Sequence, residues 1–391
     1  MTIGLPVKKR ILFVDDEPAI LAGLQNLLYK DRRRWDMTFA PSGEVGLEKL
    51  RGQAFDVVVS DMRMPGMDGA TFLNRVRDAS PATARIMLSG HAEREAIVRA
   101  LPALHQLLAK PCDAATLRAT IERSLETEAT ITDARVRAVI GKIDKLPSPP
   151  EILLELARAL DTATVTIDEI GAMVARDPGL SAKVLQLVNS GYFGLGQKTS
   201  SVAQAVSLLG AEQLRYIAVT ASVFSASAKD PPPGLSLRGV QEHALRTASL
   251  VRTFARGALS EEAFAGALLH DVGVVVLAMG FPVEYSELVA HAHATGTSEL
   301  ELERATFGTT HPEVGACLLG LWGLPPPILD IVRFHGRPGD APEASRAVAA
   351  AVHVAEAFSH AGPQIIDLAS LEKAGCASML EIWRELAKDV P

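Results

Sequence analysis

Residues 57–69 read VVVSDMRMPGMDG, a short run of β-branched residues that ends at an aspartate and leads into Pro-Gly and Asp-Gly turns. Such a run is typical of a buried strand in a parallel sheet. Four more short apolar runs, two before this stretch and two after it, alternate with helical patterns, which predicts a doubly wound sheet of five parallel strands. The expected strands are Ile11–Val14, Met37–Ala40, Val57–Ser60, Arg85–Leu88 and Gln106–Leu108. The first intervening helix carries Ile20, Leu24, Leu27 and Leu28 at helical spacing, as one apolar face.

The length, the composition and the net charge of the chain limit the classes of protein to which it can belong. A chain of 391 residues exceeds what one hydrophobic core usually supports, so we expect two or three domains. No segment approaches the roughly 20 uninterrupted apolar residues of a membrane span. Three scattered cysteines and the lack of a signal-peptide pattern in residues 1–10 favour a reducing cytoplasm. A net charge of -7 without a long basic run argues against nucleic acid as a partner.

The second half of the sequence differs from the first. A polar helical linker over residues 126–145 leads to Leu146-Pro147-Ser148-Pro149-Pro150, where the prolines stop a helix. Amphipathic helices then follow one another, so we expect an all-helical domain over residues 146–360 and a helical extension over residues 361–391. Helices are expected at Ile152–Leu160, Leu180–Asn189, Val202–Leu209 and Leu214–Phe224.

Polar side chains follow the expected strands at their carboxyl ends, where doubly wound sheets bind ligands. Asp15 and Asp16 follow the first strand, Asp61 follows the third, Ser89 the fourth and Lys110 the fifth. Three converging carboxylates repel one another unless a cation lies among them, and Mg²⁺ suits oxygen ligands. Such a site could bind a phosphoryl group after a carboxylate has attacked phosphorus. Any one of these acids could instead be a helix cap, but the ordered set argues against that interpretation.

The surrounding motifs resemble the response regulator receiver family over residues 8–125. They are Val14-Asp15-Asp16-Glu17, Ser60-Asp61-Met62-Arg63-Met64-Pro65-Gly66-Met67-Asp68-Gly69, Leu88-Ser89-Gly90 and Ala109-Lys110-Pro111. The resemblance implies a flavodoxin-like domain in which a sensor histidine kinase phosphorylates Asp61. It also implies that Asp15, Asp16, Asp61 and the Arg63 carbonyl bind Mg²⁺, while Ser89 and Lys110 contact the phosphoryl group.

One switch position departs from the receiver family. The family usually has an aromatic residue three positions before the lysine, and here that residue is Leu107. A readout that pairs an aromatic ring with the Ser89 hydroxyl is therefore in question. We expect a helix from Thr116 to about Lys142 to carry the change onward, as a rigid coupling.

Histidines and carboxylates recur along the helical half. A buried mono- or dinuclear metal site in a helical bundle requires such residues on successive helices. Neighbouring helical residues point about 100° apart, so the adjacent pair His270-Asp271 could bind one centre only from a helix that faces it edge-on. A single histidine is more often a core or capping residue, and an empty ligand set kept as a scaffold is the competing interpretation. The candidate ligands for Fe, Mn or Zn are His243, His270, Asp271, His311, His335 and Glu356.

The helical half resembles the HDOD output domains, relatives of the HD phosphohydrolases, over residues 146–360. The matching motifs include Asp177-Pro178-Gly179-Leu180, Leu268-Leu269-His270-Asp271-Val272-Gly273, Thr310-His311-Pro312-Glu313-Val314-Gly315-Ala316 and Phe334-His335. The resemblance implies a degenerate HD enzyme that acts as an interaction module. By motif position, His243 matches the first HD histidine and Glu356 the closing aspartate.

Two output functions stay open. The favoured function is an interaction module that recruits another signalling protein; the alternative is a metal-dependent phosphohydrolase that acts on a nucleotide or cyclic dinucleotide. Against catalysis, Val274 replaces the lysine of the cyclic-dinucleotide-cleaving branch, and a single histidine, His335, stands where that branch has two. The expected partners are a histidine kinase, an unidentified signalling protein and a second copy of the chain, but no membrane.

Overall fold

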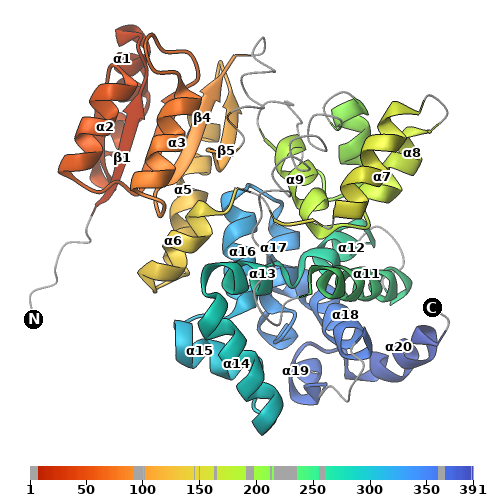
Figure 1. Ribbon diagram of the computed structural model, residues 1–391. Coiled ribbons are helices and arrows are strands. Elements are labelled where there is room, and N and C mark those ends of the chain that lie inside the picture. Colours follow the sequence, from red (N-terminus) through yellow and green to blue (C-terminus); the bar gives the residue numbers. More distant parts are fainter. Residues whose placement is uncertain are drawn as a thin grey trace, which may run out of the picture. The chain divides into compact units, whose positions relative to one another are not determined.

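The structure is a computed structural model of the chain and describes residues 8–90, 100, 102–144, 146–148, 150–162, 165–190, 198–211, 214, 236–254, 260–359, 366–388 and 390. The expected helix Leu214–Phe224 lies outside the described residues, apart from Leu214. The chain divides into two compact units (Figure 1). Most of the first unit precedes Asp144, and most of the second follows it.

A parallel sheet of five strands forms the centre of the first unit, in the order β2-β1-β3-β4-β5 (Figure 1). All five expected strands are present, each one or two residues longer than predicted. The chain order reverses beside β1, which places the polar strand ends at the switch point of a doubly wound sheet. The strands are β1 (Lys9–Val14), β2 (Trp35–Ala40), β3 (Val57–Asp61), β4 (Ala84–Ser89) and β5 (Gln106–Ala109).

Helices α1 (Pro18–Leu27), α2 (Gly43–Gly52) and α3 (Gly69–Ala79) and the 3₁₀ helix η1 (Tyr29–Arg33) connect the strands. The apolar face expected on the first helix is partly wrong. Leu28 is fully buried, but Leu27 is 41% exposed. Ile20 and Leu24 are half-buried, and no residue of α1 is fully buried. Consecutive residues at a helix end point about 100° apart, so Leu27 and Leu28 do not share one face.

The single helix expected from Thr116 to about Lys142 is also wrong. The structure has α5 (Ala114–Ala129), a break, and α6 (Ala134–Lys142). Asp133 caps α6, because its carboxylate accepts hydrogen bonds from the backbone N–H groups of Arg135 and Val136. An aspartate in this position favours a new helix start over continuation. Both helices belong to the first unit.

The second unit is helical in its described part. The expected helices Ile152–Leu160, Leu180–Asn189 and Val202–Leu209 form with shifted ends. They are α7 (Pro150–Asp161), α9 (Pro178–Val188) and an unlabelled helix Val202–Ala211. The other helices are α8 (Ile167–Val174), α11 (Leu237–Phe254), α12 (Ser260–Leu269), α13 (Val272–Gly280), α14 (Pro282–Thr295), α15 (Glu299–Phe307), α16 (His311–Leu321), α17 (Pro326–Phe334), α18 (Glu343–Ser359), α19 (Leu368–Lys373) and α20 (Leu380–Ala387), with η3 (Pro338–Asp340) and η4 (Ala377–Met379).

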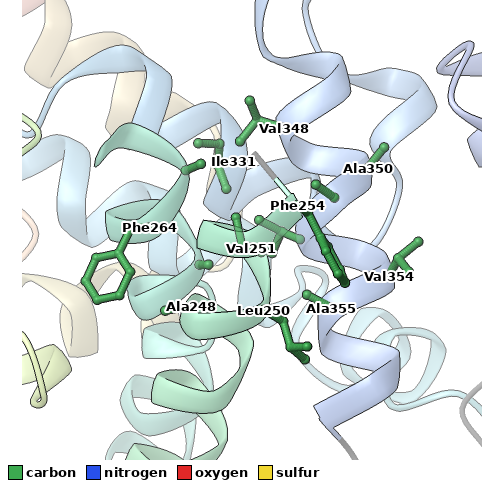
Figure 2. Packing of buried hydrophobic residues seen from close by; sticks show 14 of the residues in the cluster. Ala248, Leu250, Val251, Phe254, Phe264, Ile331, Val348, Ala350, Val354 and Ala355 are labelled. Atoms are coloured by element: carbon green, nitrogen blue, oxygen red, sulfur yellow. The ribbon is translucent and has the colours of Figure 1, made fainter. Parts of the chain in front are cut away.

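The core of this unit joins α11, α12 and α18 (Figure 2). Leu371 and Trp383 of the C-terminal helices also belong to it. Trp383 of α20 stacks on Phe254 of α11 with ring centroids 5.7 Å apart. The stretch Glu261–Gly280 has the length and composition of a membrane span, yet 78% of its apolar window is buried inside the unit. Core packing accounts for that apolar composition.

Candidate functional site

A lysine lies between two aspartates at the strand ends of the first unit. Lys110, which follows β5, donates from Nζ to Asp15 Oδ2 at 2.9 Å and forms a second, short ion pair with Asp61 Oδ1. Both carboxylates are buried, whereas Asp16 is half-buried. The structure thus brings the strand ends of β1, β3 and β5 together around one ammonium group.

Backbone N–H groups orient the other oxygens of these carboxylates. The N–H of Arg63 donates to Asp61 Oδ2 at 2.9 Å, and the N–H of Glu17 donates to Asp15 Oδ1 at 2.9 Å. Each carboxylate therefore has one oxygen held by the backbone and one facing Lys110. This arrangement fixes the rotamers of two of the three predicted acids.

Burial and charge shift the pKa values at these strand ends. Burial raises the pKa of Asp61, and the neighbouring Asp15 adds to the rise, although Lys110 opposes it. Burial also disfavours the charged form of Lys110, but its hydrogen bonds to the two aspartates outweigh burial and raise its pKa. The ammonium group stays charged at neutral pH and compensates the carboxylates.

The two residues at the predicted switch positions, Ser89 and Leu107, lie in different surroundings. Ser89, at the end of β4, is 1% exposed and its hydroxyl donates to the Gly90 carbonyl at 3.3 Å. Leu107 of β5 lies opposite Met87 of β4 and belongs to the hydrophobic core of the first unit. Leu107 thus fills a packing position.

Six predicted ligands converge in the helical unit. The Nε2 atom of His243 lies 3.4 Å from Asp271 Oδ2, and the Nε2 atom of His270 lies 3.2 Å from the same oxygen. On the other side, His311 Nε2 lies 3.6 Å from Asp271 Oδ1. The ligand atoms of His243, His270 and Asp271 all lie within 4.8 Å of one another, and so do those of Asp271, His311 and His335. The two sets of three share Asp271, and Glu356 Oε2 lies 3.9 Å from His335 Nε2.

The His270-Asp271 pair does not lie within a helix, contrary to expectation. The pair forms the turn between α12 and α13, and this turn lets both side chains face one centre. Gly273, two residues later, allows α13 to approach α16, because a Cβ there would lie 1.9 Å from the His311 carbonyl oxygen. The glycine of this motif is therefore required by packing.

Backbone carbonyls orient the buried imidazoles of His270 and His335 through Nδ1, the ring nitrogen that faces away from the cluster. Nδ1 of His270 donates to the Ala267 carbonyl at 2.6 Å, and Nδ1 of His335 donates to the Val332 carbonyl at 2.8 Å. These bonds leave Nε2 of each ring facing the cluster. Metal-binding histidines in proteins are typically oriented in this way.

Glu303 also belongs to this site, although no sequence motif indicates it. Its side chain is fully buried, and Oε1 lies 2.9 Å from His311 Nδ1. The same carboxylate accepts from the His311 N–H at 2.7 Å and from the Tyr285 hydroxyl at 3.2 Å. Its only sequence signal is a glutamate eight residues before a candidate histidine, which alone is too common to single it out.

The buried charges of the cluster shift one another's pKa values. Burial lowers the pKa of His270 and His311, but nearby carboxylates outweigh it and raise these pKa values to about 8 and about 9. Burial and its charged histidine neighbours hold the pKa of His335 well below its usual range. Burial raises the pKa of Glu356 to about 7, whereas the histidines hold that of Asp271 well below normal against burial. The carboxylates of the cluster therefore favour the positively charged forms of His270 and His311.

Comparisons with known families divide the chain in the same way. Residues 11–122 match the response regulator receiver domain, and residues 146–338 match the HDOD domain. An uncharacterized protein of Treponema pallidum (strain Nichols) is 28% identical over 232 residues, which are 58% of this chain and 44% of that protein. The transcriptional regulatory protein ZraR of Escherichia coli (strain K12) is 37% identical over 166 residues, 40% of this chain and 36% of ZraR. The chain spans less than half the length of either relative.

Two solved structures have a similar fold. The response regulator MmoQ of Methylococcus capsulatus str. Bath superposes with a TM-score of 0.51 at 24% identity, covering 62% of this chain and 98% of MmoQ. A virulence factor of Campylobacter jejuni subsp. jejuni has a TM-score of 0.54 at 19% identity, covering 66% and 96% of the two chains. The strand-end aspartates, the histidine cluster and the two family matches agree: this chain belongs to the response regulators, with a receiver domain followed by an HDOD output domain.

Proposed function

We propose that a sensor histidine kinase phosphorylates this two-component response regulator on Asp61, and that the phosphoryl group controls the HDOD domain as a protein-interaction module in the cytoplasm. The position of Lys110 between Asp15 and Asp61 carries the proposal. An ammonium at this point can hold a phosphoryl oxygen as readily as it holds a carboxylate. The kinase and the output partner are proposed from the receiver and HDOD families.

The donor set fits Mg²⁺. Asp15, Asp16, Asp61 and the backbone carbonyl of Arg63 would hold it, and all four offer oxygen, which this ion prefers. Asp15 and Asp61 already stabilise one positive charge between them, that of the Lys110 ammonium. Bound Mg²⁺ supplies charge neutralisation for the phosphoryl oxygens.

The reaction itself needs one nucleophile and two phosphoryl-binding groups. An Asp61 carboxylate oxygen attacks phosphorus, an O–P bond forms, and the P–N bond to the donor histidine breaks. Lys110 and the Ser89 hydroxyl bind the transferred oxygens. The modification adds about one to two negative charges at the strand ends, enough to reorganise neighbouring loops.

Beryllofluoride, a phosphoryl mimic, tests this assignment. With Mg²⁺ it should raise the thermal unfolding midpoint of the wild type by several degrees, because a ligand that binds the folded state stabilises it. Asp61→Asn should show no such rise. Asp56→Asn changes a half-buried carboxylate that pairs with Lys9 and accepts from the Arg10 N–H, and it should show the same rise as wild type. An equal rise in Asp61→Asn contradicts the assignment.

A second function, metal-dependent phosphoester hydrolysis by the HDOD domain, is favoured by one observation. His243, His270, Asp271, His311 and His335 bring their ligand atoms together in two sets of three that share Asp271, with Glu356 beside His335, and the residues of this ligand set are buried or half-buried. We propose that the set binds Fe, Mn or Zn, because imidazole and carboxylate donors suit these metals. Metal-loaded protein that hydrolyses a cyclic dinucleotide, with the activity lost in His270→Ala, would establish the enzyme. If the metal-loaded protein does not hydrolyse the cyclic dinucleotide, the hydrolase is excluded for this substrate and the interaction module is the function that remains.

A further inference from the structure

A charged side chain is buried at the amino end of β4. Arg85 is 1% exposed, and each of its three guanidinium nitrogens has a partner. Nε donates to the Ala103 carbonyl at 2.6 Å, and Nη1 donates to the Pro81 and Thr83 carbonyls at 3.1 Å each. A buried arginine is stable only when its donors are paired in this way.

The remaining nitrogen of Arg85 joins two further segments. Nη2 lies 2.8 Å from Nε2 of His105, the residue before β5, and donates to the Gly141 carbonyl of α6 at 2.6 Å. A guanidinium nitrogen only donates, so His105 Nε2 is the acceptor of this pair. The Arg85 backbone N–H also lies 3.2 Å from Nδ1 of the same ring. The backbone N–H of His105 also donates to the Arg85 carbonyl at 2.8 Å. Arg85 and His105 together form a pair of side chains that we call the clasp.

The clasp holds the end of α6. Gly141 carries one of the last four carbonyls of the helix, which lack partners within the helix and attract positive charge. A Cβ at Gly141 would lie 1.8 Å from the Pro81 carbonyl oxygen, so only glycine allows this approach. Val136 and Ile140 of the same helix are buried. Helix α6 is therefore docked tightly on the receiver domain.

The two strands of the clasp lead directly to the phosphorylation site. β4 runs from the clasp to Ser89, and β5 runs from it to Lys110. Four strand residues span roughly 13 Å, so the clasp and the Ser89 hydroxyl lie at opposite ends of the same strand. Paired strands behave as a stiff unit, so a shift at one end displaces the other.

Later in the sequence, after α6, a second hydrogen bond anchors the chain within the helical unit. The Ser148 hydroxyl donates to Asp177 Oδ1 at 2.6 Å, and both side chains are buried. Six residues, Lys142 to Pro147, separate Gly141 from this second anchor. The clasp is thus joined to the helical unit by a covalent connection of six residues.

We propose that the Arg85–His105 clasp on Gly141 couples the phosphorylation state of the receiver to the HDOD domain through α6. This inference rests on the proposed phosphorylation of Asp61. Reorganisation at Ser89 and Lys110 moves β4 and β5, the clasp moves with them, and α6 transmits the displacement into the connection that ends at Ser148.

Hydrogen–deuterium exchange of the full chain, with and without beryllofluoride and Mg²⁺, tests the clasp. In the wild type, beryllofluoride changes exchange both in β4 of the receiver and in residues 150–190 of the HDOD domain. In Gly141→Ala the receiver response remains and the HDOD response is lost. Without ligand, the α6 amides of this variant exchange about 10- to 100-fold faster, because a helix-end contact is lost.

Gly52→Ala is the matched control, since a Cβ at this helical glycine meets nothing within 4 Å, and it should behave as wild type. His105→Phe, which removes the acceptor and keeps a ring, replaces Gly141→Ala if the latter does not fold. An HDOD response that survives both variants overturns the clasp. A wild type that responds only in the receiver overturns the clasp but leaves phosphorylation standing, and a wild type without a receiver response overturns both.

Discussion

Lys110 Nζ lies 2.9 Å from Asp15 Oδ2, although 95 residues separate the two in the chain. The ammonium also pairs with Asp61, so one cation compensates two buried carboxylates. The carboxyl ends of β1, β3 and β5 meet here because the sheet is parallel and its order reverses beside β1. The same geometry that brings the carboxylates together creates the need for a cation.

Removing this cation should destabilise the metal-free protein. Lys110→Met leaves Asp15 and Asp61 facing each other while buried, and we expect a loss of about 1–3 kcal/mol in the free energy of unfolding. Mg²⁺ should restore part of the loss. Urea unfolding with and without Mg²⁺ measures both effects. Lys9→Met, at an exposed ion pair with Asp56, should change stability by less than about 0.5 kcal/mol. A Lys110→Met protein as stable as wild type without Mg²⁺ contradicts this account.

Glu303 should strengthen metal binding through His311. Its carboxylate lies 2.9 Å from His311 Nδ1 and makes the imidazole a better donor. Glu303→Gln keeps the shape but removes the charge, so metal affinity should fall about 10- to 100-fold in competition with a chromogenic chelator. Glu301→Gln, on the exposed face of the same helix, is the control. Equal affinities of Glu303→Gln and wild type would exclude this role.

Asp177 should make stability depend on pH. Burial raises its pKa to about 6, so between about pH 4 and 6 the folded state binds a proton that the unfolded state releases. Stability from this group therefore falls as pH rises through that window, by an amount on the order of 1–3 kcal/mol. Asp177→Asn can still cap α9 and should remove this decrease in urea unfolding. Superimposable pH profiles of variant and wild type would refute the assignment.

The C-terminal helix should contribute strongly to stability. Trp383 is 4% exposed and stacks on Phe254. Trp383→Ala should cost about 3–5 kcal/mol in urea unfolding, through lost burial and a residual cavity. Its neighbour Ile382 is 50% exposed, and Ile382→Ala should cost less than about 0.5 kcal/mol. A small, equal effect of both changes would mean that α20 does not belong to the cooperative core.

The receiver sheet could be predicted because short-range patterns determine it. Every expected strand formed, since β-branched runs between turn residues and helical patterns leave few alternatives. Leu27 and the break between α5 and α6 were mispredicted where one residue decides a helix end. In the second case the deciding residue was Asp133, a capping signal that the sequence does contain.

The residues of the histidine cluster could be predicted from the sequence, but the arrangement of their side chains could not. His270 and Asp271 were assigned to a helix, and the structure has them in a turn, because periodicity does not locate a two-residue interruption between apolar helices. Glu303 and His311 are eight residues apart and lie on successive helices, and Arg85 and His105 are 20 residues apart, so both pairs depend on how separate elements pack. No local pattern distinguishes a paired buried charge from an exposed one.

Covalent phosphorylation tests the central claim most directly. The purified chain is incubated with Mg²⁺ and acetyl phosphate, and intact and peptide mass spectrometry locate the product. The account predicts one phosphoryl group, carried by Asp61 and sensitive to hydroxylamine, in the wild type and in Asp56→Asn, and none in Asp61→Asn. An unmodified wild type, or equal modification of Asp61→Asn, would contradict the account.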